Sequence, residues 1–148
     1  MTYQLERQAI ETYFAANTTG LSVGLDGHNF TPAVDTLQIN INSGAVRQGS
    51  TGLATQVRHA IGTAVITIYT DGGKGSAAWR GYAETLVAHF TDKTIDSAGA
   101  IITATADAFA RFSPPQLGDD SHPYISANYP AAPFHVTQIT APFVRYVT

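Results

Sequence analysis

Cysteine is absent from this chain of 148 residues, and charged residues are scarce, at 13% of the composition. Without cysteine, disulfides, reactive thiolates and cysteine-ligated zinc are all excluded. Soluble proteins carry on average about twice this share of charged residues. A free monomer depends on a charged surface for its solubility, so the scarcity of charge indicates that neighbouring molecules cover part of the surface.

Runs of basic residues and long apolar runs are also missing. The net charge is −3 and the isoelectric point is near 5.9, which argues against duplex DNA as a direct ligand. No apolar stretch of about 18 residues could span a membrane, and residues 1–8 lack the pattern of a secretory signal. The basic residues are scattered: Arg7, Arg47, Arg58, Lys74, Arg80, Lys93, Arg111 and Arg145.

Two helices are predicted from apolar residues that recur at helical spacing. The first runs from a Thr2 cap to about Ala16, ends near Gly20, and has an apolar stripe of Leu5, Ala9, Ile10, Tyr13 and Phe14. The second runs from a Ser76 cap to about Phe90, with a stripe of Trp79, Tyr82, Ala83, Leu86, Val87 and Phe90. The aromatic residues of both stripes, together with Tyr3, are expected in the core.

The first half of the chain also predicts strands. Residues 21–25 form a short apolar piece, and residues 36–42 alternate strictly between apolar and polar, as in a half-buried strand. Residues 43–56 are polar and glycine-rich, so we expect a loop that folds against something else. Residues 57–70 form one run of about 45 Å, with Gly62 as the expected bulge or bend, so either part of the strand projects beyond the core or two strands share the run.

The second half continues with strands over residues 109–116, 124–129 and 134–147, while residues 98–110 fit a strand or a short helix. Pro142 cannot donate to a sheet ladder, so the last strand is expected at an edge or bent there. The order of elements predicts a single α+β domain over residues 1–148. It has a mixed, mainly antiparallel sheet, two main helices on one face and long projecting strands.

The turn before the second helix carries the strongest enzyme-like pattern. Residues 73–78 fit G-x-G-x-x-A, the turn that seats a pyrophosphate, and Asp92 or Asp96 lies roughly where an acid could bind ribose. Against this, Asp71 places a negative charge beside the proposed phosphate, and no second parallel strand–helix–strand unit follows. A plain glycine-rich turn is therefore favoured, with a small nucleotide-binding enzyme as the alternative.

No other pattern predicts catalysis or metal binding. The five histidines show no i, i+4 pair, and His89 lies off the apolar stripe, so we expect it at the surface or its boundary. Residues 119–122 offer oxygen and nitrogen ligands without the spacing of a calcium loop. Residues 49–52 are not a nucleophile elbow. The chain is therefore predicted to be no enzyme and to need no cofactor or metal.

One succession of segments, from about Leu37 to the C-terminus, resembles the tail-terminator-like proteins of long-tailed phages and related gene-transfer particles. It begins with the alternating strand at residues 37–41, a polar loop with an arginine at 44–48, and a long strand at 65–69 that ends in an acidic glycine-rich turn. A helix with an Ala-Glu-x-Leu core at 83–86, an F-x-R-F-x-x-P-like piece at 109–115, and a closing strand with Ala-Pro-Phe at 141–143 follow.

The resemblance implies a subunit that assembles into a ring, usually of six copies, in the head-proximal part of a virion tail assembled in the host cytoplasm. Such a ring caps the tail tube, stops its polymerisation and offers a docking surface to the head completion or connector protein. DNA passes through the lumen without specific binding. We expect the ring or tube contacts to involve Arg47, Gln48, Arg58, Asp71 and Lys74. Another head–tail connector and a tail tube subunit are the structural alternatives.

Overall fold

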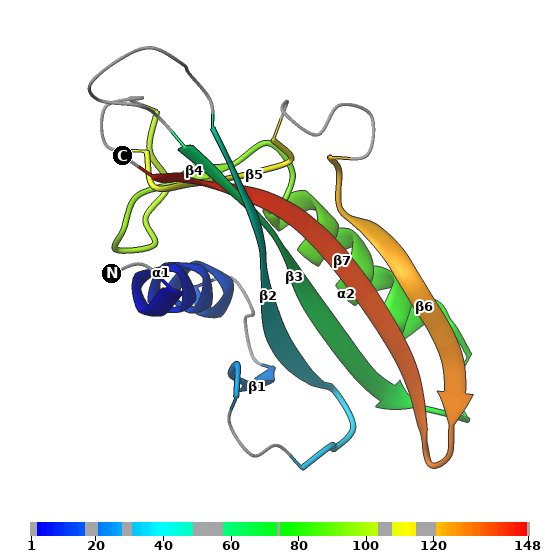
Figure 1. Ribbon diagram of the computed structural model, residues 1–148. Coiled ribbons are helices and arrows are strands. Elements are labelled where there is room, and N and C mark those ends of the chain that lie inside the picture. The colour runs from blue at the N-terminus through cyan, green and yellow to red at the C-terminus, as the bar shows by residue number, and fades with distance from the viewer. Residues whose placement is uncertain are drawn as a thin grey trace.

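The fold combines two helices with one large sheet in a computed structural model, which describes residues 3–16, 21–27, 31–48, 58–73, 75–103, 108–114 and 121–147 (Figure 1). In chain order the elements are α1 (Tyr3–Ala15), β1 (Ser22–Gly24), β2 (Thr36–Gln48), β3 (Arg58–Asp71), α2 (Ala77–His89), β4 (Thr94–Ile95), β5 (Ala110–Phe112), β6 (Tyr124–Ala131) and β7 (Phe134–Val147). The predicted α+β class is confirmed.

All seven described strands belong to one curled sheet in the order β1-β2-β3-β7-β5-β4, and β6 also pairs with β7. Only β1 and β2 run parallel, and every other pair is antiparallel. Strand β7 is therefore the centre of the sheet, with β3 along one side and β6 followed by β5 along the other. The predicted mixed, mainly antiparallel sheet is confirmed.

Both helices cover the same face of this sheet (Figure 1). Ile39, Ile66 and Ile139 stand side by side across β2, β3 and β7, and all three are fully buried in one cluster with residues of α1 and α2. Phe14 of α1 stacks on Phe90, directly after α2, with ring centroids 6.4 Å apart. The two helices thus share a single apolar core, and the opposite face of the sheet carries no described helix.

Strand β2 is longer than its alternation predicted, and the expected loop over residues 43–56 is wrong for residues 43–48, which belong to β2. The remaining residues of that loop, 49–56, lie outside the described residues. The bulge predicted at Gly62 of β3 is found in β2 instead. The register shifts between Ser43 and Val46, whereas Gly62 pairs regularly with Phe143. A Cβ on Gly44 would lie 2.4 Å from the carbonyl oxygen of Ile61, so this bulge requires glycine.

Pro142 lies in the central strand, so the predicted edge position is wrong. Its carbonyl accepts a hydrogen bond from the backbone N–H of Ser113 at 3.3 Å, on the side of β7 that faces β5 and β6. Because the N–H and C=O of a strand residue point the same way, the missing donor also faces this side. The β6 ladder stops at Thr140 and the β5 ladder begins at Phe143, so the proline occupies the junction between the two.

The helix ends differ in part from their predictions. Ser76 occupies the cap position of α2 but its side chain makes no capping hydrogen bond, so the predicted role of its hydroxyl is wrong. Tyr3 and Leu5 of α1 are exposed, whereas Glu6 is buried in the stripe where Leu5 was expected. The predicted Thr2 cap and the Gly20 stop lie outside the described residues. No helix in the described ranges is long and apolar enough to cross a membrane.

Candidate functional site

The face of the sheet turned away from both helices, here called the open face, is composed of uncharged side chains. Residues that pair across the ladders point to the same side of a sheet. Four successive rows, counted from β2 through β3 and β7 to β6, therefore form this face. They are Thr36-Tyr69-Val136-Tyr129, Gln38-Thr67-Gln138-Ala127, Asn40-Val65-Thr140-Tyr124 and Asn42-Thr63-Pro142. Along the strands the four rows extend for about 20 Å.

Charged residues lie only in the rows beyond these four, at the two ends of the open face. The row beyond Tyr69 begins with Asp71, and the row beyond Thr63 and Pro142 is Ile61-Val144-Arg111. Between them amides, hydroxyls and apolar groups alternate, with Asn42, Tyr124 and Tyr129 the most exposed. The open face can therefore form hydrogen bonds, and none of its described rows offers a fixed charge to a ligand.

The predicted contact residues fall into two groups. Arg47, Gln48 and Arg58 come together at one end of the paired strands, because Gln48 pairs with Arg58 and Arg47 with His59. Asp71 lies at the opposite end of β3, thirteen residues from Arg58 and so about 43 Å away. Lys74 lies outside the described residues. Among the four that the structure describes, Asp71 therefore lies apart from the other three.

The turn after β3 does not have the architecture of a dinucleotide site. Asp71 folds its carboxylate onto the turn, where Oδ1 accepts the backbone N–H of Gly73 at 3.0 Å. A dinucleotide fingerprint requires two parallel strands joined through the helix. Three antiparallel pairings separate β3 from β4, so the strands before and after α2 run in opposite directions. Asp92, one of the proposed ribose acids, instead lies 3.8 Å from Arg111.

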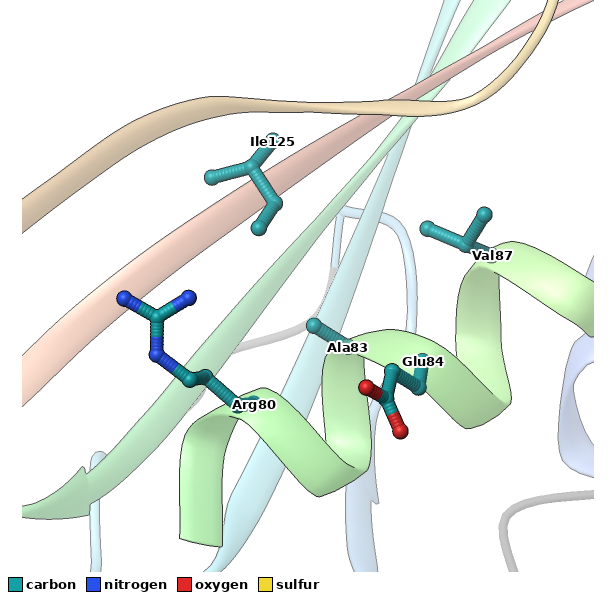
Figure 2. Close-up of a pocket in the computed structure, with 5 residues that line it drawn as sticks. All are labelled: Arg80, Ala83, Glu84, Val87 and Ile125. Carbon is teal, nitrogen blue, oxygen red and sulfur yellow. The ribbon is translucent and has the colours of Figure 1, made fainter. Parts of the chain in front are cut away.

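A groove of about 290 Å³ separates α2 from β6 (Figure 2). Ile125 points from β6 towards the helix, and Ala83 and Val87 complete an apolar floor. Arg80 and Glu84 stand one helical turn apart at its rim, both exposed. The groove thus combines apolar surface with one charge of each sign.

A buried ion pair that was not predicted from the sequence joins α1 to β7. The Nε atom of Arg145 donates to Oε2 of Glu6 at 2.7 Å, and the Ser43 hydroxyl donates to Oε1 of the same carboxylate at 2.6 Å. Glu6 and Arg145 are 1% and 3% exposed. One signal was present in the sequence: Glu6 stands three and four residues before Ala9 and Ile10, and therefore inside the apolar stripe.

His89 is buried, and its predicted surface position is wrong. Its ring stacks on Tyr13 with centroids 3.9 Å apart, and its Nε2 lies 2.9 Å from the Tyr13 carbonyl oxygen. Since a carbonyl only accepts, Nε2 carries the hydrogen. The Tyr13 hydroxyl donates in turn to the His89 carbonyl. Burial lowers the pKa of His89 and raises that of Tyr13 to about 12. This pair fastens α1 to α2 and belongs to the core.

The other histidines do not gather into a metal site in the described ranges, where no group of three or more histidine, aspartate or glutamate side chains could hold an ion. His135 stacks on Trp79 at 5.5 Å, and His59 contacts the ring edge of Tyr146. The proposed ligands Asp119 and Asp120 lie outside the described residues, and His122 is exposed.

The fold is shared with a protein of known structure. Eight chains of solved structures match this one. One of them, whose name states no function, superposes with a TM-score of 0.69 at 19% identity, and the match covers 100% of this chain and 98% of that one. This similarity establishes the fold over the whole length. No protein-family model matches the sequence. No curated protein matches it either.

Proposed function

We propose that this protein is a tail-terminator subunit of a long-tailed phage or gene-transfer particle, and that it works as a ring. The ring caps the tail tube, stops its polymerisation and presents a docking surface to the head completion or connector protein. The observation that carries this proposal is the uncharged open face, four rows long and four strands wide at most, on a chain with few charges overall.

An uncharged face suits the lumen of a ring through which DNA passes. Proteins hold DNA mainly by neutralising phosphates with lysine and arginine, and each such contact adds affinity. Amides and hydroxyls such as those of Gln38, Asn40 and Gln138 interact with water and phosphate without a fixed charge. Duplex DNA therefore slides along the open face without being retained, which is the property a conduit needs.

The edges of the sheet support assembly. Strand β6 contains no charged residue, and it exposes Tyr124, Ile125 and Tyr129. Beyond Gln38 the outer edge of β2 has no described strand beside it, and Val46 is half exposed there. Sheet edges with exposed apolar side chains are places where another chain can pair or pack. Contacts between two different edges of identical subunits produce a closed ring when the rotation from one copy to the next closes on itself.

We assign binding of the tail tube to the region where β2 ends and β3 begins. Arg47, Gln48 and Arg58 come together there through the β2–β3 ladder. Removing residues 46–54 takes away the last three residues of β2 and six of the nine residues between β2 and β3. We expect this variant to fold and to lose tube binding, measured by co-sedimentation with tail tubes of the same particle. Unaltered mass in solution and unaltered binding would contradict this assignment.

Electron microscopy of the purified protein, alone and mixed with tail tubes that lack their terminator, tests the function itself. The proposal predicts rings on the tube ends and no filaments at any protein concentration. Filaments of the protein alone would identify a tail tube subunit instead. A protein that stays monomeric and ignores the tubes would overturn the proposal.

A further inference from the structure

The α2–β6 groove leaves two opposite charges and an apolar floor exposed on one side of the molecule (Figure 2). Arg80 lies with its guanidinium carbon 4.5 Å from the Trp79 ring centroid, and Glu84 stands four residues later on the same flank. Among the described residues neither takes part in an ion pair. About four residues make one helical turn, so the two charges are separated by about 6 Å along α2.

A matching set of side chains lies along one flank of α1. Tyr3, Arg7 and Glu11 follow each other at intervals of four residues and therefore share that flank. Tyr3 is 63% exposed, and the two charged residues are half-buried. Glu11 accepts the backbone N–H of Asp26 through Oε1 at 3.1 Å, which places the flank beside β1 and the outer edge of β2. We call these three residues the α1 flank.

We infer that the α1 flank of one copy packs into the α2–β6 groove of the next copy, with α1 and α2 antiparallel. In this direction Glu11 faces Arg80 and Arg7 faces Glu84. The same step of about 6 Å separates the charges on both helices, so both pairs meet at once. Tyr3 then falls one turn beyond Glu84, against Val87 at that end of the apolar floor. In the register that opposes both charged residues of each helix, a parallel arrangement would set Arg7 against Arg80 and is disfavoured.

The positions of the two surfaces fit a ring. The α1 flank belongs to the β1–β2 side of the sheet, and the groove belongs to the β6 side (Figure 1). A contact between two different surfaces of identical subunits leaves one surface of each kind free, so further copies add, and a ring forms when the rotation between copies closes. The inference rests on the proposed function, because it identifies the contact that would build the terminator ring. An aromatic anchor surrounded by charged groups is also a common composition of protein interfaces.

Charge reversal tests the contact. Arg7→Glu and Glu84→Arg each set like charges against one another, and we expect each to raise the dissociation constant between copies about ten- to a hundredfold. The combined variant Arg7→Glu/Glu84→Arg restores opposite charges and should recover most of the lost affinity. Sedimentation velocity over a range of concentrations measures the assembly, and thermal unfolding verifies that each variant folds.

Two matched controls separate a specific contact from a general charge effect. Gln8→Glu and Thr85→Arg introduce the same charges one residue away, on exposed positions outside the flank and the groove. We expect both to assemble like the original protein.

Three outcomes would contradict the inference in different ways. If Arg7→Glu and Glu84→Arg also assemble normally, or if the combined variant assembles more weakly than either single one, the proposed contact is wrong, but the proposal of a ring is not affected. If Glu84→Arg abolishes tube binding but not assembly, a different protein occupies the groove. If the unaltered protein stays monomeric and ignores tail tubes, the proposed function fails as well.

Discussion

Glu6 and Arg145 are joined by a hydrogen-bonded ion pair of 2.7 Å although 139 positions separate them in the sequence. Both side chains are almost fully buried, at 1% and 3% exposure, and the Ser43 hydroxyl satisfies the second carboxylate oxygen. The ring of Tyr3 lies 5.6 Å from the guanidinium carbon of Arg145. The pair therefore ties the first helix to the last strand in the interior of the protein.

Breaking one half of this pair should be strongly destabilising. Arg145→Met leaves the Glu6 carboxylate in the interior without its cation, and Glu6→Gln leaves the guanidinium without its anion. An uncompensated buried charge costs about 3–5 kcal/mol, so we expect each variant to lose that much unfolding free energy, measured with urea. The combined variant Glu6→Leu/Arg145→Met buries no charge and should lose less than either single variant.

The exposed pair of Asp92 and Arg111 provides the control for this experiment. The two groups are 3.8 Å apart, and their side chains are 59% and 31% exposed. Solvent screens such a pair, so Asp92→Asn should change the unfolding free energy by less than about 1 kcal/mol. Equal losses in Glu6→Gln and Asp92→Asn would contradict the view that burial makes the first pair different.

The glycine-rich turn at residues 73–78 yields a prediction about ligands. Because β3 and β4 run in opposite directions, the turn lacks the parallel pair of strands that positions a dinucleotide. We expect NAD, ATP and inorganic phosphate to leave the midpoint of thermal unfolding unchanged. A ligand at 100 times its dissociation constant would add about 2.7 kcal/mol to the stability, which is readily measured. A reproducible upward shift would revive the nucleotide-binding alternative.

The sequence predicted those elements whose evidence is local. Both helices and most of the length of β3, β6 and β7 follow from periodicity within the segments, and the alternation of residues 36–42 correctly identified the start of β2. The continuation of β2 to Gln48 was missed because residues 43–48 contain no alternating apolar side chains. Their strand conformation depends on pairing with β3, a contact that the local pattern does not contain.

The candidate site was predicted less completely, because its parts come from distant segments. The uncharged residues of the open face are plain in the sequence, yet only the ladders align them into rows. The α2–β6 groove could not be predicted, because it forms only when Ile125 lies opposite a helix that ends 36 positions earlier in the sequence. Pro142 predicted an edge strand or a bend, because the sequence could not reveal that the ladder on one side of β7 passes from β6 to β5 at that residue.

His89 predicts a dependence of stability on pH. Desolvation lowers its pKa below the ordinary value of 6.5, and Lys93 acts in the same direction, while the hydrogen bond to Tyr13 partly opposes them. The folded state therefore favours the neutral ring, and the unfolded state takes up the proton first as the pH falls. The contribution of this group is complete above about pH 6.5 and is lost as the pH falls through the lowered pKa.

Urea unfolding between pH 8 and pH 5 measures this effect. His89→Gln keeps a donor for the Tyr13 carbonyl and removes the titrating ring, so its unfolding free energy should fall less steeply below pH 6.5. His122→Gln removes an exposed histidine and serves as the control, with the slope of the original protein retained. Identical slopes for the original protein and His89→Gln would show that this ring does not couple folding to pH.

Gly62 and Gly81 predict opposite outcomes for the same substitution. A Cβ at Gly62 would lie 2.6 Å from Cζ of Phe143 and 2.7 Å from the backbone oxygen of Asn42, whereas nothing stands within 4 Å of a Cβ at Gly81. Gly62→Ala forces the buried Phe143 ring out of its place, and overpacking of this kind costs about 1–3 kcal/mol. Gly81→Ala lies in α2 and should gain about 0.5–1 kcal/mol, because alanine loses less conformational freedom on entering a helix.

Urea denaturation of both variants beside the original protein measures the two changes. Phe143→Leu combined with Gly62→Ala shortens the side chain that the new methyl group meets, so this pair should lose less than the sum of the two single losses. Additive losses would mean that the methyl group at position 62 is resisted by the β2 backbone at Asn42 rather than by the ring. The close approach of the β2 backbone beside its bulge, and not the packing of the Phe143 ring in the core, would then be what requires glycine at position 62.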